Sequence, residues 1–181
     1  MKTHVEKQSL LDQWLAAEEA QTAMRARGPG LATREQALAV DGLTFMQALL
    51  NGELPYAHFA KTLDFTLIEV SKGRAVFQGT PKVAHLNPLG TVHGGWFATL
   101  LDSALGCAVH TMMPKGRAYT TAELGINLVR AITPEVVRVR AEAEVVHCGR
   151  QLATAQARLV GPDGKLYAHG TTTCLVFDAQ V

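Results

Sequence analysis

The stretch HGGWFATLLDSALG at residues 93–106 decides the fold, because it lies in the longest apolar segment of the chain and has helical periodicity. At about 100° per residue its large apolar side chains fall on one stripe, which predicts a buried helix over residues 93–112. His93, Gly94 and Gly95 stand at the start of this helix, where the first backbone N–H groups have no partner within the helix. Those N–H groups and the helix dipole together favour a developing negative charge.

Asp102 lies two turns beyond the glycines, on a different side of the helix from the apolar stripe. It shares that side with small residues such as Gly95, Ala98 and Gly106, which we expect to let a second chain or a thin ligand approach. A carboxylate without a partner in apolar surroundings is costly. The helical pattern alone leaves two interpretations open: a functional carboxylate, or a solvated polar position on an amphipathic helix. An anion site and a carboxylate on one helix favour acyl chemistry.

The first 40 residues have a helical pattern of apolar and polar residues, unlike the strand-like pattern that dominates the rest of the chain. Apolar residues of a short amphipathic stripe are followed by a Gly28-Pro29-Gly30 break; the stripe comprises Leu10, Leu11, Trp14 and Leu15. Thr33 and Gln36 have the spacing of a capping box, and a further helix is predicted near residues 43–50. We therefore expect residues 1–40 to be a helical extension that docks on the core or on a second subunit, and residues 41–181 to be the main domain.

Alternating apolar and polar residues predict two strands before the central helix and four strands after it. Short turns between them favour antiparallel pairing, so the fold class is α+β, with one antiparallel sheet wrapped around one long helix. In the first strand after the helix, Leu124 and Ile126 are expected to share one face with Ala122 and Leu128. Thr121 is expected on the opposite face.

Composition limits the classes of function. The 181 residues include 17 basic and 16 acidic side chains, which gives no basis for binding nucleic acid or a membrane. The first twenty residues have early acids and no apolar core, unlike a secretory signal, and three scattered cysteines fit a reducing cytoplasm. The seven histidines lack metal-ligand spacing and no phosphate-cradling glycine motif is present, so we expect neither a metal nor a cofactor.

With these residues identified, the segment from about 42 to 178 resembles the hotdog-fold thioesterases of the PaaI (phenylacetate-pathway) type. The motifs that carry the resemblance are NPLGTVHGG at 87–95, Leu101-Asp102, TAELGIN at 121–127, DGK at 163–165 and AHGT at 168–171. The resemblance implies a hotdog fold and the hydrolysis of an acyl thioester. It also implies a homodimer or homotetramer with active sites at the dimer interface.

The resemblance implies a role for each matching residue. The Gly94 N–H would bind the thioester carbonyl, and Asn87 would position that carbonyl or the attacking water. Asp102 would act as general base or as nucleophile, and the Thr121 hydroxyl would hold the water. In such enzymes we expect the carboxylate and the hydroxyl to come from different subunits.

Four further residues are expected to contact the substrate. His93 and Gly95 stand at the helix start, where the His93 ring is expected to cap free N–H groups. Arg150, beside Gly149, is the best candidate to meet the phosphates of coenzyme A. His147 and Cys148 are adjacent in a strand and therefore point to opposite faces, which argues against a nucleophilic pair.

The predicted function is hydrolysis of a medium-chain or aryl acyl-CoA thioester. Two other functions stay open. One is a non-catalytic acyl-CoA-binding or regulatory hotdog protein, which would need no base. The other is a hotdog hydroxyacyl-thioester dehydratase, which normally needs a catalytic His in a differently built motif. The presence of Asn87, Gly94, Asp102 and Thr121 together favours the hydrolase.

Overall fold

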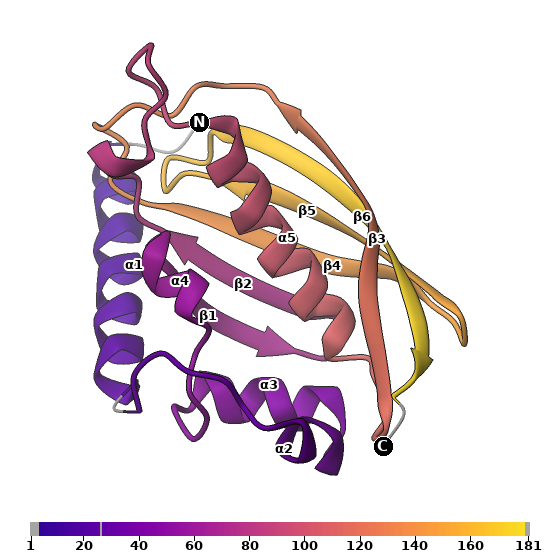
Figure 1. Cartoon of the computed structure of the whole chain (residues 1–181). Coiled ribbons are helices and arrows are strands. Elements are labelled where there is room, and N and C mark those ends of the chain that lie inside the picture. Colours follow the sequence, from indigo (N-terminus) through magenta and orange to yellow (C-terminus); the bar gives the residue numbers. More distant parts are fainter. Residues whose placement is uncertain (1–3, 26, 180–181) are drawn as a thin grey trace.

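Across residues 4–25 and 27–179, which the computed structural model describes, a six-stranded antiparallel sheet curves around helix α5 (Gly94–His110) (Figure 1). The strands are β1 (Phe65–Ser71), β2 (Arg74–Gly79), β3 (Arg117–Leu128), β4 (Val139–Cys148), β5 (Leu152–Val160) and β6 (Leu166–Asp178). Their order in the sheet is β1-β2-β4-β5-β6-β3. The predicted α+β architecture, with two strands, one long helix and then four strands, is confirmed.

The N-terminal part of the chain is helical, as predicted. Its helices are α1 (His4–Met24), α2 (Arg34–Ala39), α3 (Gly42–Leu50) and α4 (His58–Thr62), and the short 3-10 helix η1 (Val83–His85) follows β2. The capping box at α2 is confirmed, since the Gln36 N–H donates to Thr33 Oγ1 (3.1 Å) and the Thr33 N–H to Gln36 Oε1 (2.9 Å). The Asp41 carboxylate accepts the Thr44 N–H (3.1 Å) and so begins α3, the helix predicted near 43–50.

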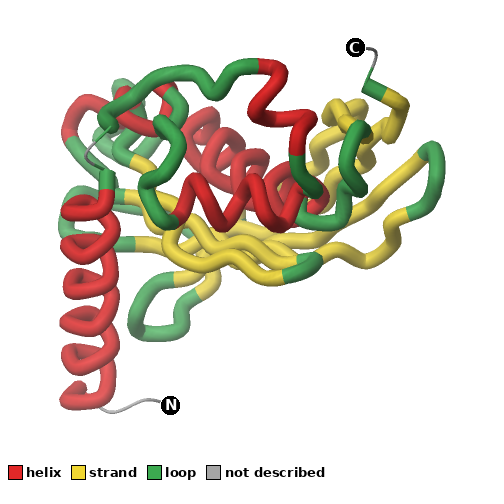
Figure 2. Tube along the Cα trace, turned by 90° about the horizontal axis from the view of Figure 1, so that it is seen from below, coloured by secondary structure: helices red, strands yellow, loops and turns green. Residues whose placement is uncertain are grey.

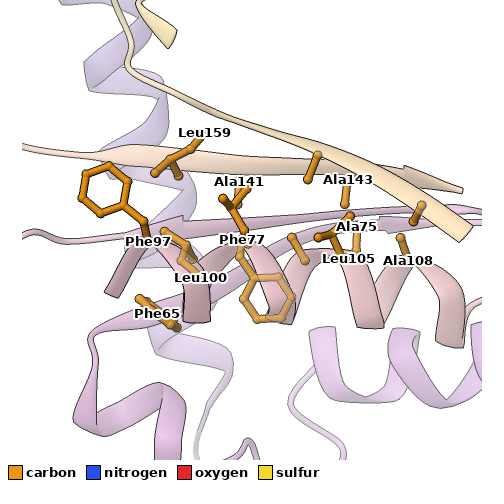
Figure 3. Close-up of a cluster of buried hydrophobic side chains, with 14 of the residues drawn as sticks. Phe65, Ala75, Phe77, Phe97, Leu100, Leu105, Ala108, Ala141, Ala143 and Leu159 are labelled. Carbon is orange, nitrogen blue, oxygen red and sulfur yellow. The ribbon is translucent and has the colours of Figure 1, made fainter. Parts of the chain in front are cut away.

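Helix α5 packs against a sheet whose inner face is lined by small residues. Its stripe of large side chains is buried as predicted, with Leu100, Leu101 and Leu105 fully inaccessible. The strands opposite contribute buried alanines, drawn in part in Figure 3: Ala75, Ala141, Ala143, Ala153, Ala155 and Ala157. At Gly79 a side-chain Cβ would lie 2.7 Å from Trp96 Cη2, closer than carbon atoms can approach. Small residues on the strands therefore allow the bulky helix face to lie close to the sheet.

Helix α1 docks on the outer face of the same sheet. Gln78 and Arg140 are register partners, and they point away from the face on which Phe77 and Ala141 meet α5. The buried Trp14 ring lies under the Arg140 guanidinium (4.6 Å), and Gln78 Nε2 donates to the Trp14 carbonyl (3.1 Å). Figure 2 shows α1 at one end of the sheet, apart from the other helices. Of the two predicted docking places, α1 thus uses the core of its own chain.

Strand β3 corrects one prediction about side-chain direction. Thr121 pairs with Cys174 and Glu123 with Thr173, so Ala122 is an extra residue in a β-bulge. Cys174 is fully buried on the inner face, and Thr121 therefore also points toward α5. The predicted placement of Thr121 on the opposite face from Leu124 is wrong, because one extra residue moves every earlier side chain to the other face.

Trp14→Ala is expected to lower the free energy of unfolding by about 3–5 kcal/mol, because a large buried ring is lost and its space stays unfilled. Trp14 is 5% exposed, so nearly all of its contact area is at stake. Urea unfolding measures the effect, and Trp14→Phe serves as the control that keeps a ring in the site. A loss below about 1 kcal/mol, typical of a surface substitution, would show that α1 adds little to the stability of the sheet.

Candidate functional site

The candidate site centres on a contact between α5 and β3. Asp102 is half-buried in the middle of α5, on the side that does not face the alanine-lined strands. Thr121, on β3, donates a hydrogen bond from Oγ1 to Asp102 Oδ1 at 3.3 Å within the same chain. The expectation that this carboxylate and this hydroxyl come from different subunits is therefore wrong. The Ala122 bulge is the physical reason that one chain brings them together, because it accompanies the turn of Thr121 toward α5.

The start of α5 forms a second set of candidate residues. His93 is the N-cap, and its Nδ1 accepts the Gly95 N–H at 2.9 Å, which confirms the predicted capping role. Among the residues that the structure describes, the Gly94 N–H has no hydrogen-bond acceptor. One of the first donors of the helix is thus occupied by His93, while the Gly94 donor is free to meet a ligand oxygen.

Asn87 shapes the loop that leads into this helix start. Its Oδ1 accepts the N–H groups of Leu89 (2.8 Å) and Thr91 (3.4 Å), and its Nδ2 donates to Thr91 Oγ1 (2.8 Å). The half-buried Asn87 amide therefore holds the turn 87–91 closed. An amide nitrogen carries two hydrogens, so one donor remains beyond these contacts. A direct contact of Asn87 with substrate stays a prediction.

The helix itself separates these two sets of residues. Gly94 and Asp102 are eight residues apart on α5. At a rise of about 1.5 Å per residue, their backbones lie roughly 12 Å apart along the axis. A carbonyl oxygen and the water that attacks its carbon are only about 3 Å apart in a reactive arrangement. One chain therefore offers two half-sites: the helix start with Asn87, and the Asp102–Thr121 pair.

Gly106 lies against Tyr119 of its own chain, whereas the sequence predicted that it would face a second chain or a ligand. A Cβ on Gly106 would lie 2.8 Å from the Tyr119 hydroxyl oxygen of the same chain. Tyr119 thus occupies the space that was expected to admit a second chain at this position. Sequence reasoning missed Tyr119, because a regular strand would have turned it away from α5. Its spacing of two residues from Thr121 was the available signal.

The thiols near the site are unsuited to nucleophilic attack. Burial raises the pKa of the Cys107 thiol to about 12, and burial also raises the pKa of the Cys174 and Cys148 thiols. At neutral pH these groups therefore remain protonated, whereas the thiolate is the reactive form. The prediction that the cysteines are ordinary thiols is supported.

Gly149 and Arg150 lie away from both half-sites, in the turn between β4 and β5. With Arg117, His147 and Phe177 they line a cavity of about 640 Å³. The β4–β5 turn lies on the side of the molecule where α5 ends and β3 begins (Figure 1). Arg117 is held by Asp178 (2.6 Å) and also donates to the Arg150 carbonyl. The Arg150 side chain is exposed. The structure therefore gathers cationic groups around this cavity without joining it to Asp102.

Two further features are absent from the described residues. None of their helices combines the length and the apolar character that crossing a membrane requires. The same residues include no group of three or more His, Cys, Asp or Glu side chains arranged to hold a metal ion.

Comparison with known proteins places most of these residues in one region of similarity. The sequence pattern of the thioesterase superfamily matches residues 89–168, which contain the helix start, Asp102, Thr121 and Arg150. A solved variant of the phenylacetic acid degradation protein PaaI from Thermus thermophilus is 30% identical to this chain, with a TM-score of 0.58. The similarity covers 65% of this chain and 96% of that protein.

Two curated proteins, each named as a candidate esterase, share shorter segments with this chain. The protein from Halobacterium salinarum is 38% identical over 73 residues, which are 40% of this chain and 48% of that protein. The protein from Caenorhabditis elegans is 33% identical over 108 residues, which are 59% of this chain and 62% of that protein. The matched segments thus span about half to three-fifths of these relatives.

Proposed function

Since this chain belongs to the thioesterase superfamily and has the hotdog fold of PaaI-like proteins, we propose that it is an acyl-CoA thioesterase. The reaction adds water to an acyl-CoA thioester and releases a free acid and coenzyme A. The observation that carries the proposal is the Asp102–Thr121 pair, with a hydroxyl 3.3 Å from a half-buried carboxylate. This pair offers both a base and a second polar atom to hold a water molecule.

In the first form of the mechanism, Asp102 takes a proton from water while the water oxygen attacks the thioester carbon. The Thr121 hydroxyl orients that water, and the tetrahedral intermediate then breaks its C–S bond and releases the thiol. A positioned base of this kind contributes roughly 10²–10⁴-fold to the rate. In the second form, the Asp102 carboxylate attacks the carbon itself and the C–S bond breaks, so that coenzyme A leaves as a thiolate and takes a proton from solvent. Water then hydrolyses the acyl-enzyme anhydride, which releases the acid and restores Asp102. Both forms use the same two side chains.

The free Gly94 N–H is proposed to stabilise the carbonyl oxygen of the substrate, whereas Asp102 and Thr121 act on the attacking water. Negative charge develops on the carbonyl oxygen as the carbon becomes tetrahedral, and a fixed N–H donor there is worth about 3 kcal/mol. His93 supports this role indirectly, because its bond to the Gly95 N–H fixes the first turn of α5. Asn87 supports it by holding the 87–91 turn that leads into the helix.

The separation of the half-sites implies a dimer. About 12 Å along α5 divides Gly94 from Asp102, so each active site would combine the helix start of one subunit with the Asp102–Thr121 pair of the other. A two-fold axis would then generate two equal sites. Strand β3 is an edge strand next to this pair, and an uncovered edge presents unpaired backbone groups to a partner. The same symmetric contact is compatible with further assembly into a tetramer.

The cationic cavity at the β4–β5 turn supports coenzyme A as the thiol that carries the acyl group. Coenzyme A ends in phosphates, and an exposed guanidinium such as that of Arg150 recognises phosphate oxygens by charge-assisted hydrogen bonds. Gly149 keeps this turn narrow, since a Cβ there would lie 2.8 Å from His147 Nε2. We propose a medium-chain or aryl acyl group as the other half of the substrate.

The proposed activity predicts that purified protein releases free thiol from acyl-CoA thioesters and that Asp102→Asn lowers kcat by roughly 100-fold or more. The amide cannot accept the proton of water, yet it keeps the size of the carboxyl group. Asp12→Asn, on an exposed part of α1, is the matched control. If the Asp102→Asn protein turned over substrate at the normal rate, Asp102 would have no part in the mechanism.

Gly94→Pro is expected to lower kcat by roughly 10²–10³-fold, because it deletes the N–H that binds the carbonyl oxygen. Proline is tolerated at the first position of a helix, and the extended backbone of His93 (φ −63°, ψ 138°) suits a residue before proline. Gly94→Ala is the control, since it keeps the N–H and meets only the end of the Leu128 side chain at 3.0 Å. Equal losses in the two variants would point to crowding instead of a lost donor.

The same variants test whether the half-sites come from different subunits. A mixed dimer of Gly94→Pro and Asp102→Asn chains has one site with both lesions and one intact site. Random exchange of subunits should therefore restore roughly a quarter of wild-type activity, provided that the sites act independently. If confirmed exchange restores nothing, Gly94 and Asp102 do not meet across a dimer interface.

Arg150→Ala is expected to raise KM for an acyl-CoA by roughly tenfold while leaving KM for the matching acyl-pantetheine unchanged, because only coenzyme A carries the terminal phosphates. Steady-state kinetics with both substrates measure the difference. Arg34→Ala, which removes an exposed guanidinium from α2, controls for net charge. A rise in KM for both substrates would place Arg150 near the acyl or pantetheine group instead.

A further inference from the structure

On the N-terminal side of its bulge, strand β3 directs Tyr119 and Thr121 at α5, and only Thr121 belongs to the proposed chemistry. Tyr119 pairs with Val176 and Thr121 with Cys174, and both partners are buried on the inner face of the sheet. Residues two apart on a strand are about 6.6 Å apart, and residues four apart on a helix are separated by about 6 Å. This near-match in spacing sets Tyr119 over Gly106 while Thr121 meets Asp102.

The Tyr119–Gly106 contact leaves no room for a side chain on the helix. A Cβ at residue 106 would lie 2.8 Å from the Tyr119 hydroxyl oxygen, but 3.5 and 3.6 Å from the ring atoms Cε2 and Cζ. The hydroxyl would therefore collide with alanine, whereas the ring would make an ordinary contact. His110, one turn further along α5, packs against the same ring with centroids 5.7 Å apart. Tyr119 is thus seated between two successive turns of the helix.

The Tyr119–Gly106 contact lies close to Thr121, at a point where β3 is weakly held by backbone hydrogen bonds. Among the described residues, strand β3 lies at the edge of the sheet and pairs with β6 alone. The bulge at Ala122 interrupts that pairing immediately beside Thr121. A bulge disrupts the ladder and bends its strand, so backbone hydrogen bonds hold this point less firmly than the rest of β3. Tyr119 is two residues from Thr121 on the same strand, and it packs closely against Gly106 and His110 of α5.

We propose that Tyr119 is a positioning residue whose seat against Gly106 sets the place of β3 along α5 and thereby holds the Thr121 hydroxyl at Asp102. The inference rests on the proposed function, because it concerns the same carboxylate–hydroxyl pair. In this proposal, the missing side chain of Gly106 leaves the space that the Tyr119 hydroxyl occupies. Burial raises the pKa of Tyr119 well above its ordinary value, so the group stays a neutral, fixed phenol at working pH.

The experiment is a double-mutant cycle on kcat. Gly106→Ala is expected to lower kcat by roughly tenfold, about the loss expected for Thr121→Ala, with little change in KM, because substrate binding surfaces are intact while the hydroxyl moves off Asp102. In a Tyr119→Phe background the oxygen that would collide is gone. Adding Gly106→Ala there should lower kcat less than twofold, and this coupling is the signature of positioning.

A matched variant separates positioning from general strain. Gly161→Ala presses a Cβ against another tyrosine, Tyr167 Cε2 at 3.0 Å, away from the site. It is expected to lower the melting temperature and to leave kcat unchanged. If Gly106→Ala protein is insoluble, Tyr119→Leu takes its place, since it removes the seat without a collision and should also lower kcat with little effect on KM.

The outcomes distinguish this inference from the function on which it rests. Wild-type kcat in Gly106→Ala, or an equal loss in the Tyr119→Phe background, would overturn the positioning role. Wild-type kcat in Tyr119→Leu would do the same. Wild-type kcat in both Asp102→Asn and Thr121→Ala would instead overturn the proposed active site. A loss in those two variants together with the coupled loss at Gly106 supports both.

Discussion

The close approach of α5 to the sheet is the constraint on which the rest of the structure depends. The many alanines on the inner face, together with Gly79, let the large side chains of α5 pack close to the sheet, because larger side chains at those positions would hold the two layers apart. Once α5 is fixed, its start, its middle and its end each face a different part of the chain. The loop at 87–91 leads into the start, Thr121 contacts the middle, and α3 and Tyr119 contact the end.

That rigid helix also explains why the candidate chemistry is divided. A straight helix keeps Gly94 and Asp102 at a constant separation, so neither side-chain motion nor loop movement brings them to one carbonyl group. The division protects each half from the other, since a carboxylate close to the free N–H of Gly94 would pair with it. In the proposed dimer, two copies of the chain would convert this separation into a fixed distance between two groups that act on one substrate.

The local features of this fold could be predicted from the sequence, whereas the direction of the side chains on β3 could not. The buried stripe of α5, the order of the elements, the capping box at Thr33 and the cap at His93 follow from local periodicity and local hydrogen bonding. The bulge at Ala122 has no such local signal, because an extra residue in a strand is detected only against its neighbour. The sequence therefore predicted the wrong face for Thr121. Tyr119 was missed for the same reason. The expectation that Thr121 and Asp102 come from different subunits had another source, the family resemblance, and the contact within one chain contradicts it.

The docking of α1 has a consequence for the order in which the chain folds. Glu18 bonds to Gln78 and to Arg138, partners 60 and 120 residues later in the sequence. Helix α1 thus has no surface to cover until β2 and β4, which follow it in the chain, have been made. Contacts of such long range close large loops and slow the search for the native state. During that interval the ring of Trp14 is exposed, and an exposed apolar side chain favours self-association of an incompletely folded chain.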